Sequence, residues 1–180
     1  MGWLDRIREI HEAPWKPVSA PALIASSVFI AAVSWFANSE HHWVPILDTA
    51  NLAFHEAGHP LFGLVNRRLT VYGGTLGQLV FPVVASVAFW TRREAVSCVI
   101  AAAWLNENLW NVATYMADAR TQVLPLVGNG EHDWTHIFSR WGVLHLDTGI
   151  AGVVRMIGWA GMLSAWGWLA WRWRRDREYA

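Results

Sequence analysis

The sequence has few charged residues and almost no cysteine. Of its 180 residues, 16% are charged, with 14 Lys and Arg balancing 14 Asp and Glu. Soluble domains usually carry about 25% charged residues. The formal net charge of zero provides no electrostatic basis for binding nucleic acid. The single cysteine, Cys98, cannot form a disulfide within the chain and is expected to be a small packing residue.

The charges that remain are gathered into short clusters, and the stretches between them are apolar. A membrane-spanning helix needs roughly 20 mostly apolar residues. Five stretches satisfy this length, at residues 17–39, 43–66, 69–91, 95–119 and 148–171. The sequence therefore predicts one all-α domain, a polytopic transmembrane helix bundle of about five spans in a lipid bilayer. The first stretch is expected to be a retained span, because it lacks an obvious cleavage site.

Two segments modify this simple pattern. Residues 120–147 are expected to form a loop with a short amphipathic helix at about 134–143, which lies along the interface or caps the bundle. Its apolar face comprises Trp134, Ile137, Phe138 and Trp141. Near the start of the third span, Gly73-Gly74 permits a re-entrant segment, because glycine adopts backbone shapes that other residues resist.

The second span contains His55-Glu56-Ala57-Gly58-His59, which matches the pattern His-Glu-x-x-His. Residues four apart lie on one face of a helix, so the two imidazoles can bind one zinc ion. The Glu beside the first His then reaches water at the metal as a general base. Ionisable groups are costly inside a membrane and usually mark function. The motif therefore predicts Zn²⁺ on His55 and His59, with Glu56 as the catalytic residue.

Two polar stripes accompany the motif. Polar residues share one face of the second span: Asp48, Asn51, His55, His59 and Asn66. A similar stripe runs along the fourth span: Glu107, Asn111, Tyr115 and Asp118. We expect the two stripes to face each other across the bundle. Either Asp48 or Asn51 is then a candidate acceptor for the second N–H group of a zinc-binding imidazole.

The third zinc ligand is left open by these residues. A hydrolytic zinc site normally has three protein ligands and one open position. Glu107 and Asp118 lie roughly 6–10 Å to either side of the depth of His59, at 1.5 Å per helical residue. Three groups of the loop emerge on the same side and remain candidates: His132, Asp133 and His136.

The order of these features resembles the site-2-protease class of intramembrane zinc metallopeptidases. The shared features are the His-Glu-x-x-His span, Gly73-Gly74 after it, and an acidic residue on a later span. The resemblance implies that His55, His59 and Asp118 bind Zn²⁺, that Glu56 activates water, and that the glycine segment holds an extended substrate strand. Asp118 nevertheless stands between Ala117 and Ala119, whereas that class has a Leu-Asp-Gly context.

A second likeness favours Glu107 instead. Asn106-Glu107, followed by Asn111, is similar to the Asn-Glu-x-x-x-Asp helix of thermolysin-like enzymes, in which the Glu binds zinc. The chain also resembles small bacterial membrane proteins that carry His-Glu-Ala-Gly-His-Pro and Gly-Glu-His-Asp-Trp stretches. That similarity implies an integral protein of the bacterial inner membrane.

The expected function is hydrolysis of a peptide or transmembrane protein substrate by a membrane zinc metallopeptidase. Tyr115 or His132 is the candidate for stabilising the oxyanion. Three alternatives remain: a divalent-metal transporter, a b-type haem protein, and a membrane scaffold without catalytic activity. Metal uptake into vesicles distinguishes the first of these, and a visible absorption spectrum distinguishes the second.

Overall fold

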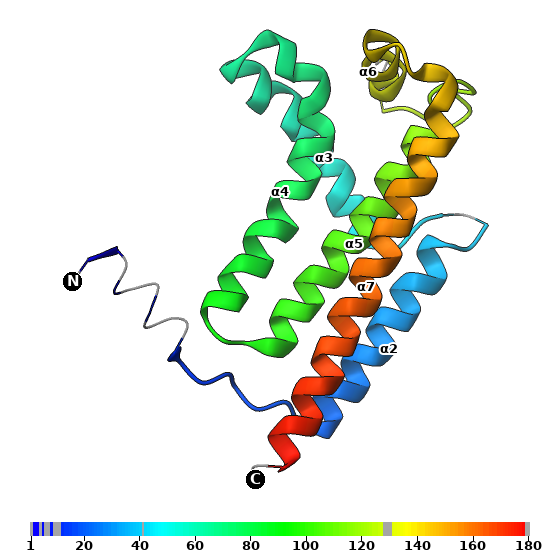
Figure 1. The fold of residues 1–180 in the computed structure, drawn as a ribbon. Coiled ribbons are helices and arrows are strands. Elements are labelled where there is room, and N and C mark those ends of the chain that lie inside the picture. Colours follow the sequence, from blue (N-terminus) through cyan, green and yellow to red (C-terminus); the bar gives the residue numbers. More distant parts are fainter. Residues whose placement is uncertain are drawn as a thin grey trace.

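The computed structural model describes residues 2–3, 5, 8, 12–40, 42–127 and 131–178. Within them the chain is all-helical, as predicted, with six α-helices and no strand. The helices are α2 (Ala20–Ala37), α3 (Leu47–Val65), α4 (Thr70–Thr91), α5 (Ala95–Ala117), α6 (Asp133–Trp141) and α7 (Asp147–Glu178) (Figure 1). Two 3₁₀ turns, η1 (Arg67–Leu69) and η2 (Leu144–Leu146), precede α4 and α7. Of the expected loop 120–147, residues 128–130 lie outside the described part.

Three long helices, α2, α5 and α7, run side by side through the molecule (Figure 1). A short turn joins α5 to α4, and α4 packs in turn against α3. The end of α3, the start of α4, helix α6 and the start of α7 all lie at the same end of the bundle (Figure 1). The second half of the His-Glu-x-x-His helix is therefore close to the loop that follows α5.

Three segments of the described chain are long and apolar enough to cross a membrane: Ala20–Ala37, Arg67–Thr91 and Leu144–Glu178. Large apolar side chains point outward from them. Ile24 and Val28 of α2 are both 64% exposed, and Val84 of α4 is 60% exposed. Exposed apolar surface on this scale is typical of contact with lipid. These helices indicate membrane association. Helices α3 and α5 also form where spans were expected, but they carry the polar stripes.

The short helix expected after the fourth span is α6. Its Trp134, Ile137 and Phe138 side chains are buried, and they pack in one cluster with Ala113 of α5 and Ala151 of α7. Helix α6 therefore caps the bundle with these three side chains, whereas Trp141, also expected on this face, is 54% exposed. The cap brings the start of α6 toward α3, which is the feature on which the site depends.

Helices α3 and α4 approach each other closely because glycines line their contact. A Cβ atom added at Gly58 would lie 2.0 Å from the carbonyl oxygen of Gly73, and one at Gly77 would lie 2.3 Å from that of Phe54. Small residues allow helix backbones to pack directly in membranes. Gly73 and Gly74 lie inside the continuous helix α4. The irregular re-entrant segment that the sequence permitted is therefore not formed, and the glycines serve helix packing.

We expect Gly58→Ala to lower the midpoint of thermal unfolding, because the new methyl group would meet backbone atoms of α4 that cannot move aside. Overpacking of this kind typically costs about 1–3 kcal/mol. Circular dichroism of the purified protein in detergent measures the midpoint. Gly167→Ala in α7 is the matched control, since nothing lies within 4 Å of a Cβ atom there. Equal midpoints for the two variants would contradict the direct α3–α4 contact.

Candidate metal centre

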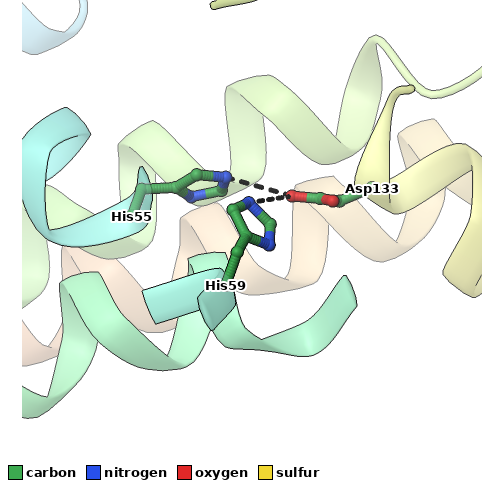
Figure 2. Close-up of side chains that lie close together, drawn as sticks. All are labelled: His55, His59 and Asp133. Carbon is green, nitrogen blue, oxygen red and sulfur yellow. Dashed lines mark hydrogen bonds and ion pairs between the residues drawn. The ribbon is translucent and has the colours of Figure 1, made fainter. Parts of the chain in front are cut away.

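Three side chains from two helices meet at the capped end of the bundle. Figure 2 shows the rings of His55 and His59, both on α3, turned toward the carboxylate of Asp133 at the start of α6. Oδ2 of Asp133 lies 3.0 Å from Nε2 of His55 and 3.4 Å from Nε2 of His59. One ligand atom from each residue lies within 4.8 Å of the other two. His55 and Asp133 are buried, and His59 is half-buried.

The two histidines are brought together by their spacing on α3. Residues four apart share a helical face, and the two ring centroids lie 4.9 Å apart. Gly74 of α4 makes room for the first ring, because a Cβ atom added there would lie 2.4 Å from Nε2 of His55. The glycine contact between α3 and α4 therefore also accommodates His55.

Asp133 is held in place by the start of α6. It is the first residue of that helix, where the helix dipole and free N–H groups favour a carboxylate. The preceding His132 caps the helix, since its Nδ1 accepts a hydrogen bond from the N–H of Thr135 at 3.3 Å. The N–H of Asp133 itself donates to the hydroxyl oxygen of Tyr115 on α5 at 3.2 Å. These contacts aim the Asp133 carboxylate at α3.

Both histidines of the motif use Nδ1 for a hydrogen bond to a carbonyl oxygen. Nδ1 of His59 lies 2.8 Å from the backbone oxygen of Thr70, and Nδ1 of His55 lies 2.9 Å from Oε1 of Gln78. A carbonyl oxygen can only accept, so the single proton of each neutral ring lies on Nδ1. Each Nε2 then carries a lone pair, and both lone pairs face the carboxylate of Asp133.

This set of donors fits Zn²⁺. Tetrahedral ligands bonded at about 2.0–2.1 Å lie roughly 3.3 Å from one another, and the two Nε2–Oδ2 distances are 3.0 and 3.4 Å. Two imidazole lone pairs and a carboxylate repel one another unless a cation or a proton lies between them. Zinc-binding histidines also commonly donate their other N–H group to a carbonyl or carboxylate oxygen. The residues therefore fit zinc in donor type, tautomer and spacing.

Asp118, the third ligand implied by the resemblance, lies outside this cluster. It ends α5, and its carboxylate binds the following loop. Oδ1 accepts hydrogen bonds from the Thr121 hydroxyl at 2.6 Å and the Val123 N–H at 2.9 Å, and Oδ2 accepts one from the Leu124 N–H at 3.1 Å. Asp118 thus anchors the loop, and its histidine neighbour is the helix-capping His132 at 3.5 Å.

Glu107, the other candidate on α5, also lies apart from the histidines. Its Oε2 accepts a hydrogen bond from the Asn51 amide at 2.8 Å, and the same amide donates to Asp48 at 3.2 Å. Asn51 lies about one helical turn before His55 on α3. The two polar stripes therefore face each other, as expected. Glu107, however, is part of a buried hydrogen-bond network with Asn51 and Asp48, which precede the His-Glu-x-x-His motif on α3.

The cluster opens into a cavity of about 930 Å³, whose exposed surface is mostly apolar although many of the side chains that line it are polar or charged. The apolar lining comes from several elements and includes Leu52, Val71, Val112, Leu124 and Leu126. Glu56 lines the same cavity and is exposed to it. Its carboxylate has no hydrogen-bond or ion-pair partner within the described residues, so it is free to act on a molecule bound beside the histidines.

Comparison with family models, with curated proteins and with solved structures gives no match for this chain. No similarity to another protein therefore assigns it an activity. The assignment of function depends on the geometry of the side chains around the motif.

Two hydrogen-bond partners of the histidines, Gln78 and the backbone of Thr70, were not predicted from the sequence. A third partner, Asp133, was one of several candidates. Gln78 is the only amide side chain in the 22 residues of α4, and it lies four residues after Gly74 on the same face. A lone amide in an apolar helix was the available signal. Thr70 acts through its backbone oxygen, so its side chain gives no signal. Asp133 was one of the loop candidates, and only the packing of α6 singles it out.

We expect the purified protein to hold about one zinc ion per chain and Asp133→Ala to lose it, because the carboxylate supplies the third donor. Asp118→Asn is the matched control, since that carboxylate binds the loop instead. Elemental analysis after dialysis measures the metal content. Retention of zinc by Asp133→Ala together with its loss from Asp118→Asn would reverse the assignment.

Proposed function

We propose that this protein is a membrane-embedded zinc metallopeptidase that hydrolyses peptide bonds in the cavity beside His55, His59 and Asp133. The observation that carries this proposal is the geometry of the two histidines: Nδ1 of each ring faces a carbonyl oxygen, while Nε2 of each ring faces the carboxylate of Asp133. Glu56 follows the first histidine and lines the same cavity. A helical His-Glu-x-x-His motif with a third ligand is the arrangement used by many zinc peptidases.

The three ligands would be His55, His59 and Asp133, a set that leaves one coordination position open for substrate or water. A zinc ion held there supplies a Lewis acid, which polarises a peptide carbonyl and acidifies water near neutral pH. His55 and Asp133 are buried, which limits the access of bulk water to these two groups. Electrostatic interactions at the site are stronger for that reason.

The proton transfers fall to Glu56. Its carboxylate accepts a proton from the attacking water and then gives this proton to the amide nitrogen as the C–N bond breaks. One water molecule is thereby added across the peptide bond, which produces a carboxylate and an amine. The position next to His55 places Glu56 on the cavity side of α3, where no partner among the described residues competes for the proton.

Tyr115 is the residue that we assign to the oxyanion. Its hydroxyl oxygen accepts the N–H of Asp133, and its hydroxyl proton has no acceptor in the described part of the chain. The side chain lines the cavity and its ring lies 5.8 Å from that of His55. A donor in this position can stabilise developing negative charge on a carbonyl oxygen. His132, the alternative, is buried behind the cavity wall as the cap of α6.

The proposed substrate is an apolar peptide segment, such as an unwound stretch of a transmembrane protein. The cavity volume of about 930 Å³ is near the upper end of the roughly 300–1,000 Å³ found for small-molecule sites. It has room for a few residues of extended chain. Apolar walls favour apolar side chains in the substrate.

We also propose that α3 and α5 cross the membrane with the three apolar segments, which makes five spans. Their polar side chains bond to each other, as in the contact of Asn111 with Asp48 at 2.9 Å, and so turn away from lipid. The outward face of α3 carries Leu61 and Leu64, which are 61% and 86% exposed. The bacterial inner membrane is the proposed location, on the strength of the resemblance to small bacterial membrane proteins.

The proposed site differs from the site-2-protease pattern in the origin of its third ligand. Asp133 comes from the short cap helix α6, whereas that class takes the acidic ligand from a later span. Gly73 and Gly74 pack against α3 rather than forming a strand for substrate. The likeness to that class therefore rests on the motif helix and on the acidic partner that reaches it.

We expect Glu56→Gln to abolish peptide cleavage and to leave the zinc content unchanged, because the amide cannot accept the proton from water. Loss of a general base typically lowers the rate about 10²–10⁴-fold. Cleavage of a fluorogenic apolar peptide by the protein in detergent measures the rate, and elemental analysis measures the zinc.

Glu131→Gln is the matched control for this substitution. Glu131 lines the same cavity but pairs with His136, so its loss should leave the rate close to that of the parent. A Glu56→Gln variant as active as the parent would refute the assigned role. A parent that binds zinc, cleaves no peptide and carries zinc into vesicles would favour the transporter instead.

A further inference from the structure

A chain of hydrogen bonds leads from His55 through two neighbouring helices and back to α3. Nδ1 of His55 donates to Oε1 of Gln78 on α4 at 2.9 Å. Nε2 of Gln78 faces Oδ1 of Asn111 on α5 at 3.4 Å, and Nδ2 of Asn111 donates to Oδ1 of Asp48 at 2.9 Å. Asp48 lies about two helical turns before His55. The chain therefore joins a histidine of the candidate metal centre to a distant buried carboxylate.

We propose that Gln78, Asn111 and Asp48 are positioning residues that hold the proton of His55 on Nδ1 and so keep its Nε2 lone pair free for a metal ion. This inference rests on the proposed zinc site. A neutral imidazole carries one proton, and a proton on Nε2 would occupy the position that the metal needs. The hydrogen-bond chain therefore selects the tautomer of His55 in which Nε2 can bind a metal ion.

The direction of donation along this hydrogen-bond chain is set by groups that can donate a hydrogen bond but cannot accept one. The backbone N–H of Val44 donates to Oδ2 of Asp48 at 2.5 Å. The indole N–H of Trp104 donates to Oδ1 of Asn51 at 2.7 Å, which turns the NH₂ group of Asn51 toward Oδ1 of Asp48 at 3.2 Å. Both oxygens of Asp48 are therefore acceptors.

Each following amide has only one favourable orientation. Because Asp48 accepts, Asn111 presents its NH₂ group to Asp48 and its oxygen to Gln78. Gln78 then presents its NH₂ group to Asn111 and its oxygen to His55. Asn111 turned over would face an oxygen of Asp48 with its oxygen and the NH₂ group of Gln78 with its own NH₂ group. Gln78 turned over would place its oxygen against the oxygen of Asn111. Asp48 and Gln78 are only 1% and 3% exposed, so a reversed amide leaves buried polar groups without partners, which is costly.

His59 provides an internal reference, because its tautomer is held separately. Its Nδ1 bonds the backbone oxygen of Thr70 at 2.8 Å. That bond does not involve Gln78, Asn111 or Asp48. Any effect of the chain on the tautomer should therefore appear at His55 and leave His59 unchanged.

The test replaces links of the chain in the full-length protein, purified in detergent, and measures two quantities. One is the Kd for Zn²⁺, by competition with a chelator. The other is the ring ¹⁵N NMR shift of each histidine in the metal-free protein with neutral rings, which reports the protonated nitrogen. We expect Gln78→Leu to weaken zinc binding about 10–100-fold. It should also move His55 toward the Nε2-protonated tautomer while His59 keeps its own.

Two further variants and a control separate positioning from general packing. Gln78→Glu retains an oxygen acceptor and is expected to restore the tautomer of His55 and most of the zinc affinity. Asp48→Asn removes the group that orients the chain and is expected to leave His55 as a mixture of tautomers. Asn106→Ala is the control, since its buried amide donates to the backbone oxygen of Ala102 at 2.7 Å and lies outside the chain.

The outcomes distinguish this inference from the proposed function. A Gln78→Leu variant with the zinc Kd and His55 tautomer of the parent would overturn the inference and leave the zinc site intact. The parent protein could instead bind no zinc while its His55 has the expected tautomer and changes it in Gln78→Leu. That result would overturn the proposed function and leave the role of the hydrogen-bond chain intact. If Gln78→Leu does not fold, the tautomer of His55 in Asp48→Asn decides, and an unchanged tautomer there overturns the inference.

Discussion

Polar side chains within the apolar bundle must find partners on neighbouring helices, and the rest of the structure depends on this requirement. Asp48 and Asn51 of α3 bond to residues of α5, including Glu107 and Asn111. Each pairing satisfies a buried polar group, which would cost several kcal/mol without a partner. Facing stripes therefore fix the rotation of α3 relative to α5. They also turn the next residues of the α3 stripe, the two histidines, toward the interior of the bundle.

Two local packing features complete the candidate metal centre at the end of the α3 stripe. The glycines of α3 and α4 bring the helices close enough for Gln78 and the backbone of Thr70 to reach the Nδ1 atoms of the histidines. The apolar face of α6 closes the bundle and delivers Asp133 to their Nε2 atoms. Each ring is thus held from one side by a carbonyl and meets a carboxylate on the other, which is the environment of a metal-binding histidine.

The sequence predicts the parts of this arrangement that depend on spacing along one helix. His55, Glu56 and His59 could be named because a separation of four residues places side chains on one face, and the facing stripes follow from the same periodicity. The helices lie where the five apolar stretches were expected, although α7 continues through its basic end to Glu178. Helical hydrogen bonding does not require the side chains to stay apolar.

The acidic partner could not be chosen in this way. Counting residues along α5 leaves Glu107 and Asp118 at similar distances from the histidines. The position of Asp133 depends on how the loop folds back, which is decided by the bonds of Asp118 to Val123 and Leu124 and by the packing of Phe138. These contacts join residues from separate helices and leave no periodic signal. Gln78 was overlooked for a similar reason, since its role appears only when α4 lies against α3.

We propose that one metal ion lies among His55, His59 and Asp133. An anomalous-difference map from crystals of the zinc-loaded protein, recorded at the zinc absorption edge, tests it most directly. We expect a single strong peak in contact with Nε2 of both histidines and with the Asp133 carboxylate. A peak between Asp118 and His132, or one bonded to Nδ1 of either motif histidine, would contradict it.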